Sequence, residues 1–354
     1  MAKFNLFKKK AKKGSNGFHS LIIKDIKSLT DASVQIDLDI PEELKKDFLF
    51  KPGQYLDFEF VIDKEKLRRS YSICSGPKDN VSIGVKAIEG GKVSNWFKNE
   101  AKKGDALFVA PPNGQFVYGE EKSIVCFAAG SGITPILSIA KHAKFIGAKV
   151  QLYYGNKSEA STMYVNELKS LLGDDLHLFF TEKVEAIGRK GRLDAENLSA
   201  IVKENLDLLK ADAFFLCGPQ GMIEAVNEKL NTFGVPLHKI KKELFVANDL
   251  EDNSEGSQDE VVKSLVTVTL DGEEIDVQFK PKGKTILELL DAEGYDPPYS
   301  CRGGVCSTCK AKITEGSAIM KVNYTLTDEE VANGEILCCQ AQPTSSKLKV
   351  TFDD

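Results

Sequence analysis

Three cysteines within nine residues constrain this chain more tightly than any other feature of its sequence. Cys301, Cys306 and Cys309 stand as C-x4-C-x2-C in the loop CRGGVCSTC. This is the plant-type spacing for ligands of a 2Fe–2S cluster, for which soft thiolates are the preferred donors. A zinc ribbon would need two C-x2-C pairs, and the chain has one. The alternatives to a cluster are therefore zinc or plain buried thiols, and we expect a cluster wrapped by a glycine-rich loop.

A fourth thiolate must come from elsewhere in the chain. Two cysteines, Cys338 and Cys339, are adjacent in the segment EILCCQAQP. Neighbouring side chains cannot easily both face one cluster, so we expect one to be a ligand and the other to be a packing residue. Spacing alone does not choose between them.

The amino-terminal sequence and the cysteines bear on where the chain works. The start, MAKFNLFKKKAKKGSNG, is basic and has neither the apolar stretch nor the cleavage site of a secretory signal. The sequence therefore predicts a cytoplasmic protein with metal-bound or free thiols. No apolar run approaches the roughly 20 residues of a membrane span, and no basic stripe is typical of nucleic-acid binding, so neither partner is expected. Residues 1–15 are predicted to be a disordered basic tail, with a membrane- or partner-binding arm as the alternative.

Charge divides the chain and predicts its domains. Residues 1–248 carry a net charge of +6, residues 249–262 carry −6 and residues 263–354 carry −5. The acidic segment, NDLEDNSEGSQDE, is poor in aromatic and β-branched residues, so we expect an extended linker over residues 248–261. A length of 354 residues is itself consistent with two or three domains.

The pattern of apolar residues changes along the chain. Over residues 16–118 short alternating runs separated by turns predict an antiparallel β-barrel or sandwich. Over residues 119–247 apolar strands alternate with helical stretches, which predicts an α/β domain with a parallel sheet. Over residues 262–354 we expect a hairpin around Asp271-Gly272, a helix near residues 285–293 and a final strand over residues 347–352.

Two motifs in the first domain have the chemistry of a flavin site. In Arg69-Ser70-Tyr71-Ser72 an arginine can pair with phosphate, a tyrosine can stack on an isoalloxazine ring and a hydroxyl can hydrogen-bond flavin N5. The alternative is an exposed arginine beside an ordinary strand tyrosine. Further on, glycines precede a helix expected over residues 95–100, whose amides would face a diphosphate. The candidates of this second region are Lys86, Gly91, Lys92, Val93 and Ser94.

Loops of the second domain predict a nicotinamide site. The segment GSGITP follows an apolar strand and opens a helix, but it is not G-x-G-x-x-G, so an ordinary Rossmann dehydrogenase is not expected. Asn156 and Lys157 follow the next strand and favour a 2′-phosphate, hence NADPH, whereas the nearby Glu159 would favour NADH. The cofactor-binding candidates of these loops are Gly130, Ser131, Gly132, Thr134, Pro135, Asn156, Lys157, Cys217, Gly218 and Pro219.

The motifs at residues 69–72, 90–94, 130–135 and 217–219 together resemble the ferredoxin–NADP reductase superfamily. That resemblance implies FAD, with Arg69 and Ser94 at its pyrophosphate, Tyr71 against the flavin and Ser72 near N5. It places Cys217 beside the nicotinamide and Phe245 over the flavin, so Ser72, Cys217 and Phe245 are the catalytic candidates. Cys74, close by, is expected to be a small core residue.

The cysteine-rich segment resembles plant-type ferredoxins, which have a β-grasp fold. In that family the last ligand precedes a glutamine, and this selects Cys339 over Cys338. The order FAD, nicotinamide, ferredoxin is similar to the reductase components of multicomponent oxygenases such as phenylacetyl-CoA epoxidase. It implies that hydride passes from NAD(P)H to flavin N5 and that single electrons then pass through the cluster to an oxygenase. The alternatives are a reductase for a membrane desaturase or a hybrid-cluster protein, and a non-enzymatic electron carrier or redox sensor.

Overall fold

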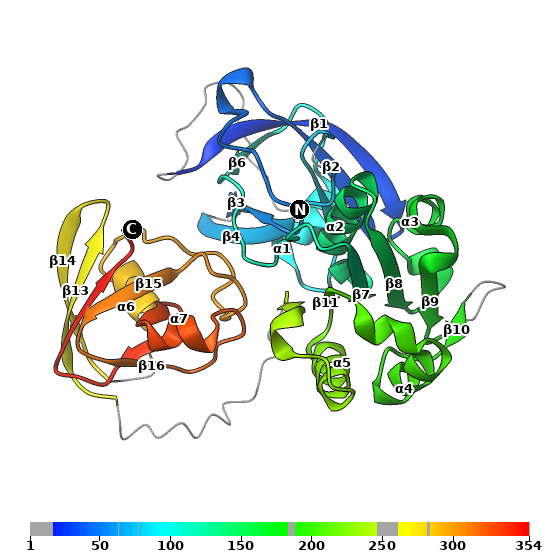
Figure 1. Cartoon of the computed structure of the whole chain (residues 1–354). Helices are drawn as coiled ribbons and strands as arrows, with labels where there is room; N and C mark the ends of the chain where they lie inside the picture. Colours follow the sequence, from blue (N-terminus) through cyan, green and yellow to red (C-terminus); the bar gives the residue numbers. More distant parts are fainter. Residues whose placement is uncertain are drawn as a thin grey trace. The chain divides into compact units, whose positions relative to one another are not determined.

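The computed structural model describes residues 17–62, 64–76, 78–182, 188–245, 261–281 and 284–353 (Figure 1). The chain divides into two compact units, residues 1–245 and residues 246–354, here called the first and the second unit. The basic tail expected over residues 1–15 lies outside the described residues, as does all but the last residue of the linker expected over residues 248–261.

The first unit begins with an antiparallel barrel. Its six-stranded sheet has the order β4-β3-β6-β1-β2-β5, and a bridge between Ile73 and Ile83 joins the two ends of that order. Helix α1 (Lys92–Asn99) turns Trp96 and Phe97 into the barrel, where Phe97 packs edge-on against Phe58 at 5.7 Å. The strands are β1 (His19–Thr30), β2 (Ser33–Asp39), β3 (Tyr55–Ile62), β4 (Glu65–Ser72), β5 (Ser82–Lys86) and β6 (Ala106–Val109).

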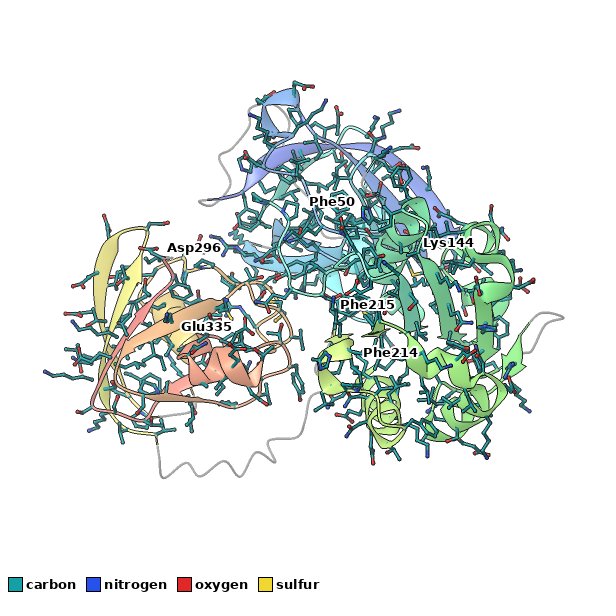
Figure 2. All side chains as sticks on the ribbon, viewed as in Figure 1. Phe50, Lys144, Phe214, Phe215, Asp296 and Glu335 are labelled. Carbon is teal, nitrogen blue, oxygen red and sulfur yellow. The ribbon has the colours of Figure 1, made fainter. Side chains whose placement is uncertain are left out.

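A parallel sheet follows in the same unit, with the strand order β10-β9-β8-β7-β11-β12. Helices α2 and α3 share one buried cluster with the sheet, and Figure 1 shows α4 and α5 on the opposite side of it. Phe214 and Phe215 are consecutive on β11, so they point to opposite faces; both are fully buried (Figure 2). These elements are β7 (Ser123–Ala129), α2 (Ile133–Phe145), β8 (Lys149–Asn156), α3 (Val165–Leu172), β9 (Leu176–Phe180), β10 (Arg189–Lys190), α4 (Ala195–Glu204), β11 (Ala213–Cys217), α5 (Gln220–Thr232) and β12 (Ile240–Glu243).

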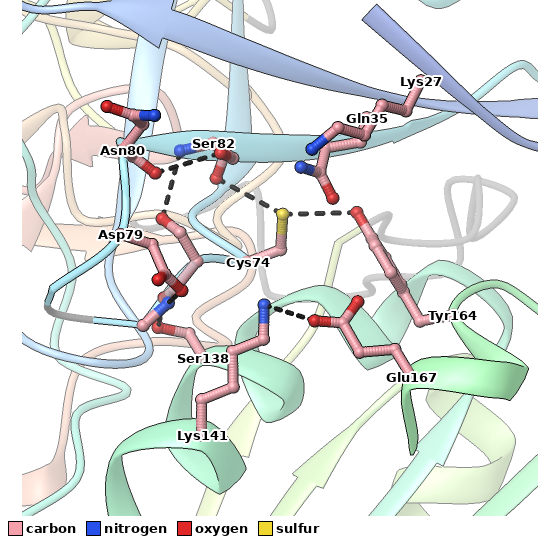
Figure 3. Close-up of polar contacts among 12 residues, drawn as sticks. Lys27, Gln35, Cys74, Asp79, Asn80, Ser82, Ser138, Lys141, Tyr164 and Glu167 are labelled. Atoms are coloured by element: carbon pink, nitrogen blue, oxygen red, sulfur yellow. Dashed lines mark hydrogen bonds and ion pairs between the residues drawn. The ribbon is translucent and has the colours of Figure 1, made fainter. Parts of the chain in front are cut away.

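Polar contacts join the barrel to the parallel-sheet domain (Figure 3). The Tyr164 hydroxyl donates to the Cys74 sulfur at 3.2 Å, and the Ser138 hydroxyl donates to the Ser75 carbonyl at 2.7 Å. A Cβ on Gly84 would lie 2.5 Å from Thr134 Cγ2 and 2.7 Å from the Tyr164 hydroxyl. The two domains therefore meet without room for a side chain at Gly84.

The second unit is a mixed sheet against which a helix packs. Its five-stranded sheet has the order β14-β13-β19-β15-β17, and the first two strands form a hairpin whose turn residues, Asp271 and Gly272, both have positive φ, as a type I′ turn requires. Thr285 and Glu288 form a capping box at the start of α6. The elements are β13 (Ser264–Leu270), β14 (Glu273–Phe279), α6 (Ile286–Ala292), β15 (Lys310–Glu315), β16 (Ala318–Met320), α7 (Asp328–Ala332), β17 (Glu335–Leu337), β18 (Ala341–Pro343) and β19 (Lys347–Thr351).

The predicted fold class is confirmed: a β-barrel, an α/β parallel-sheet domain and a β-grasp domain. The expected hairpin and the helix near residues 285–293 are also present. One expectation is wrong. The helix predicted over residues 95–100 begins at Lys92 and ends at Asn99, so part of the glycine-rich motif forms its first turn.

Among the described helices, none has the length and apolar character needed to cross a membrane. Short 3-10 helices complete the fold at η1 (Glu42–Leu44), η2 (Gly130–Gly132), η3 (Glu159–Ser161), η4 (Gly173–Asp175), η5 (Leu206–Lys210) and η6 (Leu237–Lys239).

Candidate functional site

The nucleotide-binding candidates gather at one edge of the parallel sheet. Strands β8, β7 and β11 are neighbours, so their carboxyl ends bring the loops after Asn156, Ala129 and Cys217 together. A Cβ on Gly132 would lie 2.2 Å from the Cys217 carbonyl oxygen and 2.8 Å from the Gly218 nitrogen. Two loops that are far apart in sequence therefore touch backbone to backbone, and only glycine fits between them.

Two side-chain hydroxyls hydrogen-bond to the backbone of the first of these loops. Gly130 has φ +55°, and its carbonyl accepts a hydrogen bond from the Tyr154 hydroxyl at 2.9 Å. The Thr134 hydroxyl donates to the Ser131 carbonyl at 3.0 Å. Thr134 and Pro135 are buried at the start of α2, so they support the loop and leave its surface to Gly130 and Ser131. The structure therefore gives Thr134 and Pro135 a supporting place beneath the predicted phosphate loop.

Cys217, the expected nicotinamide neighbour, is fully buried. Its sulfur lies 4.0 Å from a carboxylate oxygen of Glu243, a residue that the sequence analysis missed. Burial raises the pKa of Glu243 to about 8, and burial with this neighbouring carboxylate raises the pKa of Cys217. Both shifts favour the protonated forms of these groups. Phe245, two residues after Glu243, is partly buried against the same core.

Asn156 and Lys157, at the carboxyl end of β8, differ in their exposure to solvent. Asn156 is 9% exposed, and its side-chain nitrogen has no hydrogen-bond partner among the described residues. Lys157 is well exposed, with its ammonium 3.7 Å from Glu182. Glu159, the carboxylate that would favour NADH, instead pairs with Lys169 at 2.5 Å. The competing carboxylate is thus engaged, while a different one, Glu182, faces Lys157.

Lys86 brings positive charge to this edge from the barrel. Its ammonium lies 3.7 Å from where a Cβ on Gly130 would stand. Desolvation and repulsion by Lys157 lower the pKa of Lys86. Lys157 is close enough to Lys86 to repel it, so two lysines from different domains bring positive charge to this edge. Such a site favours an anion, because an anion would relieve their repulsion.

The R-S-Y-S motif lies on β4. The Arg69 side chain is exposed and donates to the Arg68 carbonyl at 2.7 Å, and the Ser70 hydroxyl donates to Asp57 at 2.6 Å. Tyr71 packs edge-on against Phe97 at 5.3 Å, and burial raises its pKa. Ser72 is buried at the end of the strand. Alternation along the strand thus sends Ser70 and Ser72 to the same face and Tyr71 to the other.

The second flavin motif forms the amino terminus of α1. Val93 is buried in the barrel core, so of this residue only the amide could face a ligand. The Ser94 hydroxyl lies 3.4 Å from the Ile88 amide, and Lys92 pairs with Glu65 at 2.6 Å. The N-cap residue of this helix, Gly91, has no side chain that could cap it, which suits the first turn to an outside acceptor. A Cβ on Gly91 would lie 2.4 Å from the Ser94 hydroxyl, so the tight turn requires glycine.

The predicted cluster ligands converge in the second unit. The sulfur atoms of Cys301 and Cys306 are 3.0 Å apart, and hydrogen bonds from Cys306 and Cys339 lower the pKa of Cys301. Cys339 interacts in turn with Cys309. Residues 301–309 and residue 339 thus supply a set of four thiols, the donors that a 2Fe–2S cluster takes. In the described part of the chain no three His, Cys, Asp or Glu side chains are arranged to hold a single metal ion.

Cys338 is placed differently from Cys339. It is 0% exposed, its amide donates to the Cys309 carbonyl at 3.0 Å, and burial raises the pKa of its thiol. Cys339 instead faces Cys301 and Cys309. The adjacent cysteines therefore have separate surroundings, one within the core and one beside the other thiols.

Sequence reasoning missed several residues that build these sites. They are Gly84, Tyr154, Tyr164, Glu243 and Gln340. Each contacts a partner that no local motif marks. Two of them had a signal in the sequence: Gln340 is the glutamine that follows Cys339, and Glu243 lies two residues before Phe245.

Three family models match the chain in succession. The oxidoreductase FAD-binding domain matches residues 20–118, the oxidoreductase NAD-binding domain matches residues 127–228, and the 2Fe-2S iron-sulfur cluster binding domain matches residues 268–344. Their order is the order of barrel, parallel sheet and β-grasp domain in the fold.

Relatives and solved structures share this arrangement. A subunit of the 1,2-phenylacetyl-CoA epoxidase of Escherichia coli (strain K12) is 34% identical over 95% of this chain and 98% of that protein. The ferredoxin reductase component of 3-ketosteroid-9-alpha-monooxygenase of Rhodococcus rhodochrous is 33% identical over 88% and 91%. The structure of phthalate dioxygenase reductase, at 23% identity, superposes with a TM-score of 0.61 over 95% of this chain and 98% of that one, a likeness of fold.

Proposed function

We propose, on the premise that this chain belongs to the family of reductases with FAD-binding, NAD-binding and 2Fe–2S domains, that its electron acceptor is an oxygenase component. The chain is an NAD(P)H-dependent oxidoreductase that uses FAD and a 2Fe–2S cluster to reduce an acceptor protein. When bound, the flavin takes two electrons from a nicotinamide and passes them on singly, as a one-electron cluster requires.

The observation that carries the nicotinamide part of the proposal is the close approach at Gly132. The G-S-G loop and the Cys217-Gly218 segment meet there at the limit of backbone contact. This forms a glycine-lined edge that suits a dinucleotide phosphate and a nicotinamide ring. The barrel of the same unit carries Arg69 and the start of α1, both suited to a flavin diphosphate.

We assign the predicted roles to these residues on that basis. Arg69 and Ser94 would bind the FAD pyrophosphate with the amides of Gly91, Lys92 and Val93. Tyr71 would pack against the flavin and Ser72 would donate to N5. Cys217 and Phe245 would lie at the nicotinamide and flavin rings. Each role requires only groups that the chain presents: amides at a helix start, an exposed guanidinium and a hydroxyl at a strand end.

We also propose that NADPH is the preferred donor. Lys86 and Lys157 would supply positive charge near Gly130, and Asn156 would offer a buried amide nitrogen to the ribose phosphate. Because Glu159 is engaged by Lys169, it does not oppose the phosphate.

For the cluster we propose the ligands Cys301, Cys306, Cys309 and Cys339. The acceptor would be a multicomponent di-iron oxygenase such as phenylacetyl-CoA epoxidase. Support comes from the relatives, which include an epoxidase subunit and ferredoxin reductase components of a monooxygenase.

The test uses the full chain with FAD and cluster loaded. Addition of NADPH should bleach the flavin absorbance and then produce the electron paramagnetic resonance signal of a reduced 2Fe–2S cluster. Phenylacetyl-CoA epoxidase subunits should then turn over phenylacetyl-CoA with stoichiometric NADPH oxidation. A reduced cluster without such turnover would reject this acceptor and leave the reductase chemistry standing, whereas no flavin bleaching would reject both.

A further inference from the structure

Gln340 lies immediately after the proposed ligand Cys339 and is only 8% exposed. Its side-chain nitrogen donates to two acceptors. One is the Arg302 carbonyl oxygen at 2.9 Å, and the other is the Cys339 sulfur at 3.6 Å. A buried amide group that satisfies both of its N–H bonds is fixed in place.

The orientation of this amide is set by chemistry. A backbone carbonyl and a thiolate can only accept hydrogen bonds, so the NH2 end of Gln340 must face them. The backbone of Gln340 is held as well. Its amide donates to the Leu337 carbonyl at 2.8 Å, and its carbonyl accepts from the Lys321 amide at 3.1 Å. The donor therefore reaches the sulfur from a rigid support.

The carbonyl that Gln340 binds belongs to the loop of the first ligand. Arg302 follows Cys301 and has φ +56°, a left-handed conformation that is unusual for a non-glycine residue. Its side chain pairs with Asp291 at 2.5 Å and stacks over the Tyr299 ring at 4.1 Å. The loop is thus fixed on one side by the Arg302 side chain and on the other by Gln340.

Close packing completes the contact between the two segments. Gly304 has φ +71°, and a Cβ there would lie 3.1 Å from Cγ of Gln340. The amide of Gly303 points to the Cys301 sulfur at 3.4 Å. Thirty-eight residues separate Arg302 from Gln340 in sequence, so this one side chain joins two ligand-bearing segments that are far apart along the chain.

We propose that Gln340 is a positioning residue for the cluster. It clamps the loop of Cys301 to Cys339 and donates a hydrogen bond to the Cys339 sulfur. A hydrogen bond to a ligand sulfur stabilises added negative charge, so Gln340 favours the reduced cluster and raises its reduction potential. This inference rests on the proposed ligand Cys339.

The test compares two glutamines of the same segment in the full, loaded chain. Gln342 is also 8% exposed, and its amide donates to the Lys284 carbonyl at 2.8 Å, with no cysteine as partner among the described residues. We expect Gln340→Leu to shift the midpoint potential of the cluster to a more negative value and Gln342→Leu to leave it unchanged. A tenfold shift of the reduction equilibrium corresponds to about 59 mV for one electron.

Iron and sulfide content and the rate of iron release to a chelator are the second readout. Gln340→Glu keeps the shape of the side chain and places an acceptor against the carbonyl and the thiolate. Cluster loss or about 10- to 100-fold weaker iron retention in both Gln340 variants, with Gln342→Leu intact, would support the clamp.

Gln340→Leu with a full cluster at the wild-type potential would overturn the proposal, as would an equal shift in Gln342→Leu. The ligand set is tested apart from it. A complete cluster in Cys339→Ser would reject that ligand, and a wild-type chain with no reducible cluster would reject the proposed function.

Discussion

At the residue scale, the groups that surround each sulfur separate the cysteines of the chain. Cys74 is buried with no second cysteine beside it among the described residues. Burial raises its pKa to about 12, so it stays a neutral thiol at physiological pH. It therefore acts as a small core residue that also exchanges hydrogen bonds. Three others resemble it in burial and raised pKa, namely Cys126, Cys217 and Cys338. Of the remaining four thiols, Cys301, Cys306 and Cys309 share one loop and Cys339 lies beside it, so that each has another sulfur as neighbour.

The first prediction distinguishes the adjacent cysteines. Cys339→Ser should remove or degrade the cluster, because a hydroxyl is a poorer ligand for iron than a thiolate. Cys338→Ser should retain the cluster and lose about 1–3 kcal/mol of stability, since it buries a hydroxyl in an apolar core. Iron and sulfide analysis of the two purified variants, with unfolding followed by circular dichroism, measures both effects. Normal cluster content in Cys339→Ser would contradict the assignment.

The second prediction concerns Lys157. Lys157→Ala should raise the Michaelis constant for NADPH and leave that for NADH almost unchanged. Since Lys157 is 75% exposed, we expect a contribution near the lower end for a charged hydrogen bond, about 1.4 kcal/mol or tenfold. Steady-state rates with both nicotinamides measure the ratio.

Glu182 provides the control for Lys157. Its carboxylate lies 3.7 Å from the ammonium, so Glu182→Gln should release Lys157 from this pair and improve the use of NADPH modestly. Equal losses with both cofactors in Lys157→Ala, or a wild-type preference for NADH, would show that Lys157 is an ordinary surface lysine.

At the scale of elements, local sequence patterns predicted those strands, helices and turns that depend on neighbouring residues alone. The hairpin at Asp271-Gly272 and the alternating β and α stretches follow from turn chemistry and from apolar periodicity, so the sequence was sufficient for them. The start of α1 was predicted three residues too late, at Asn95 in place of Lys92. The glycine-rich pattern predicts a turn that runs from Gly90 to Ser94. In the structure, Lys92–Ser94 instead form the first turn of the helix and bury Val93 in the barrel.

What local patterns could not predict are contacts between elements. The place of Gly84 against Thr134 and Tyr164 depends on how the barrel meets the parallel-sheet domain. Likewise, the contact of Gln340 with Arg302 joins segments 38 residues apart. The preference for Cys339 over Cys338 required a family resemblance, because both cysteines fit the spacing equally well.

The third prediction tests the contact between the segment after β4 and the start of α3. Tyr164 stands before α3 with φ +59°, a strained conformation for a tyrosine, and its hydroxyl donates to Cys74. Tyr164→Phe should lower the temperature of FAD release by about 2–4 °C, the effect of about 1 kcal/mol in a domain pair of this size. The double variant with Cys74→Ala should lose less than the sum of the two single variants, because both remove the same hydrogen bond.

Tyr153→Phe is the matched control for Tyr164→Phe. Tyr153 is also buried, with its ring stacked at 4.6 Å on His177, but its hydroxyl has no protein partner among the described residues. Its loss should leave the temperature of FAD release unchanged. Additive losses from Tyr164→Phe and Cys74→Ala would mean that the hydroxyl and the thiol do not interact.

At the scale of the whole molecule, the chain separates functions that differ in chemistry. Hydride transfer needs a nicotinamide and a flavin in contact, and the loops suited to both lie in the first unit. One-electron transfer needs only a cluster, and its thiols lie in the second unit, which has its own buried core. Two independent cores imply that each unit can fold without the other.

The last prediction follows from that independence. Cutting the chain near Ser254, within the segment predicted to be a linker, should leave a first unit that binds FAD and oxidises NADPH with ferricyanide at a rate within about twofold of the full chain. Cytochrome c reduction should fall at least about tenfold, because that acceptor would take its electrons from the cluster, and the cluster thiols all lie beyond the cut. Adding the separately made second unit in trans should restore part of the cytochrome c activity, in proportion to its concentration, since the covalent link supplies a high effective concentration. Loss of FAD or precipitation of the truncated chain would mean that residues 262–354 complete the core of the first unit. Unchanged cytochrome c reduction would mean that electrons leave directly from the flavin.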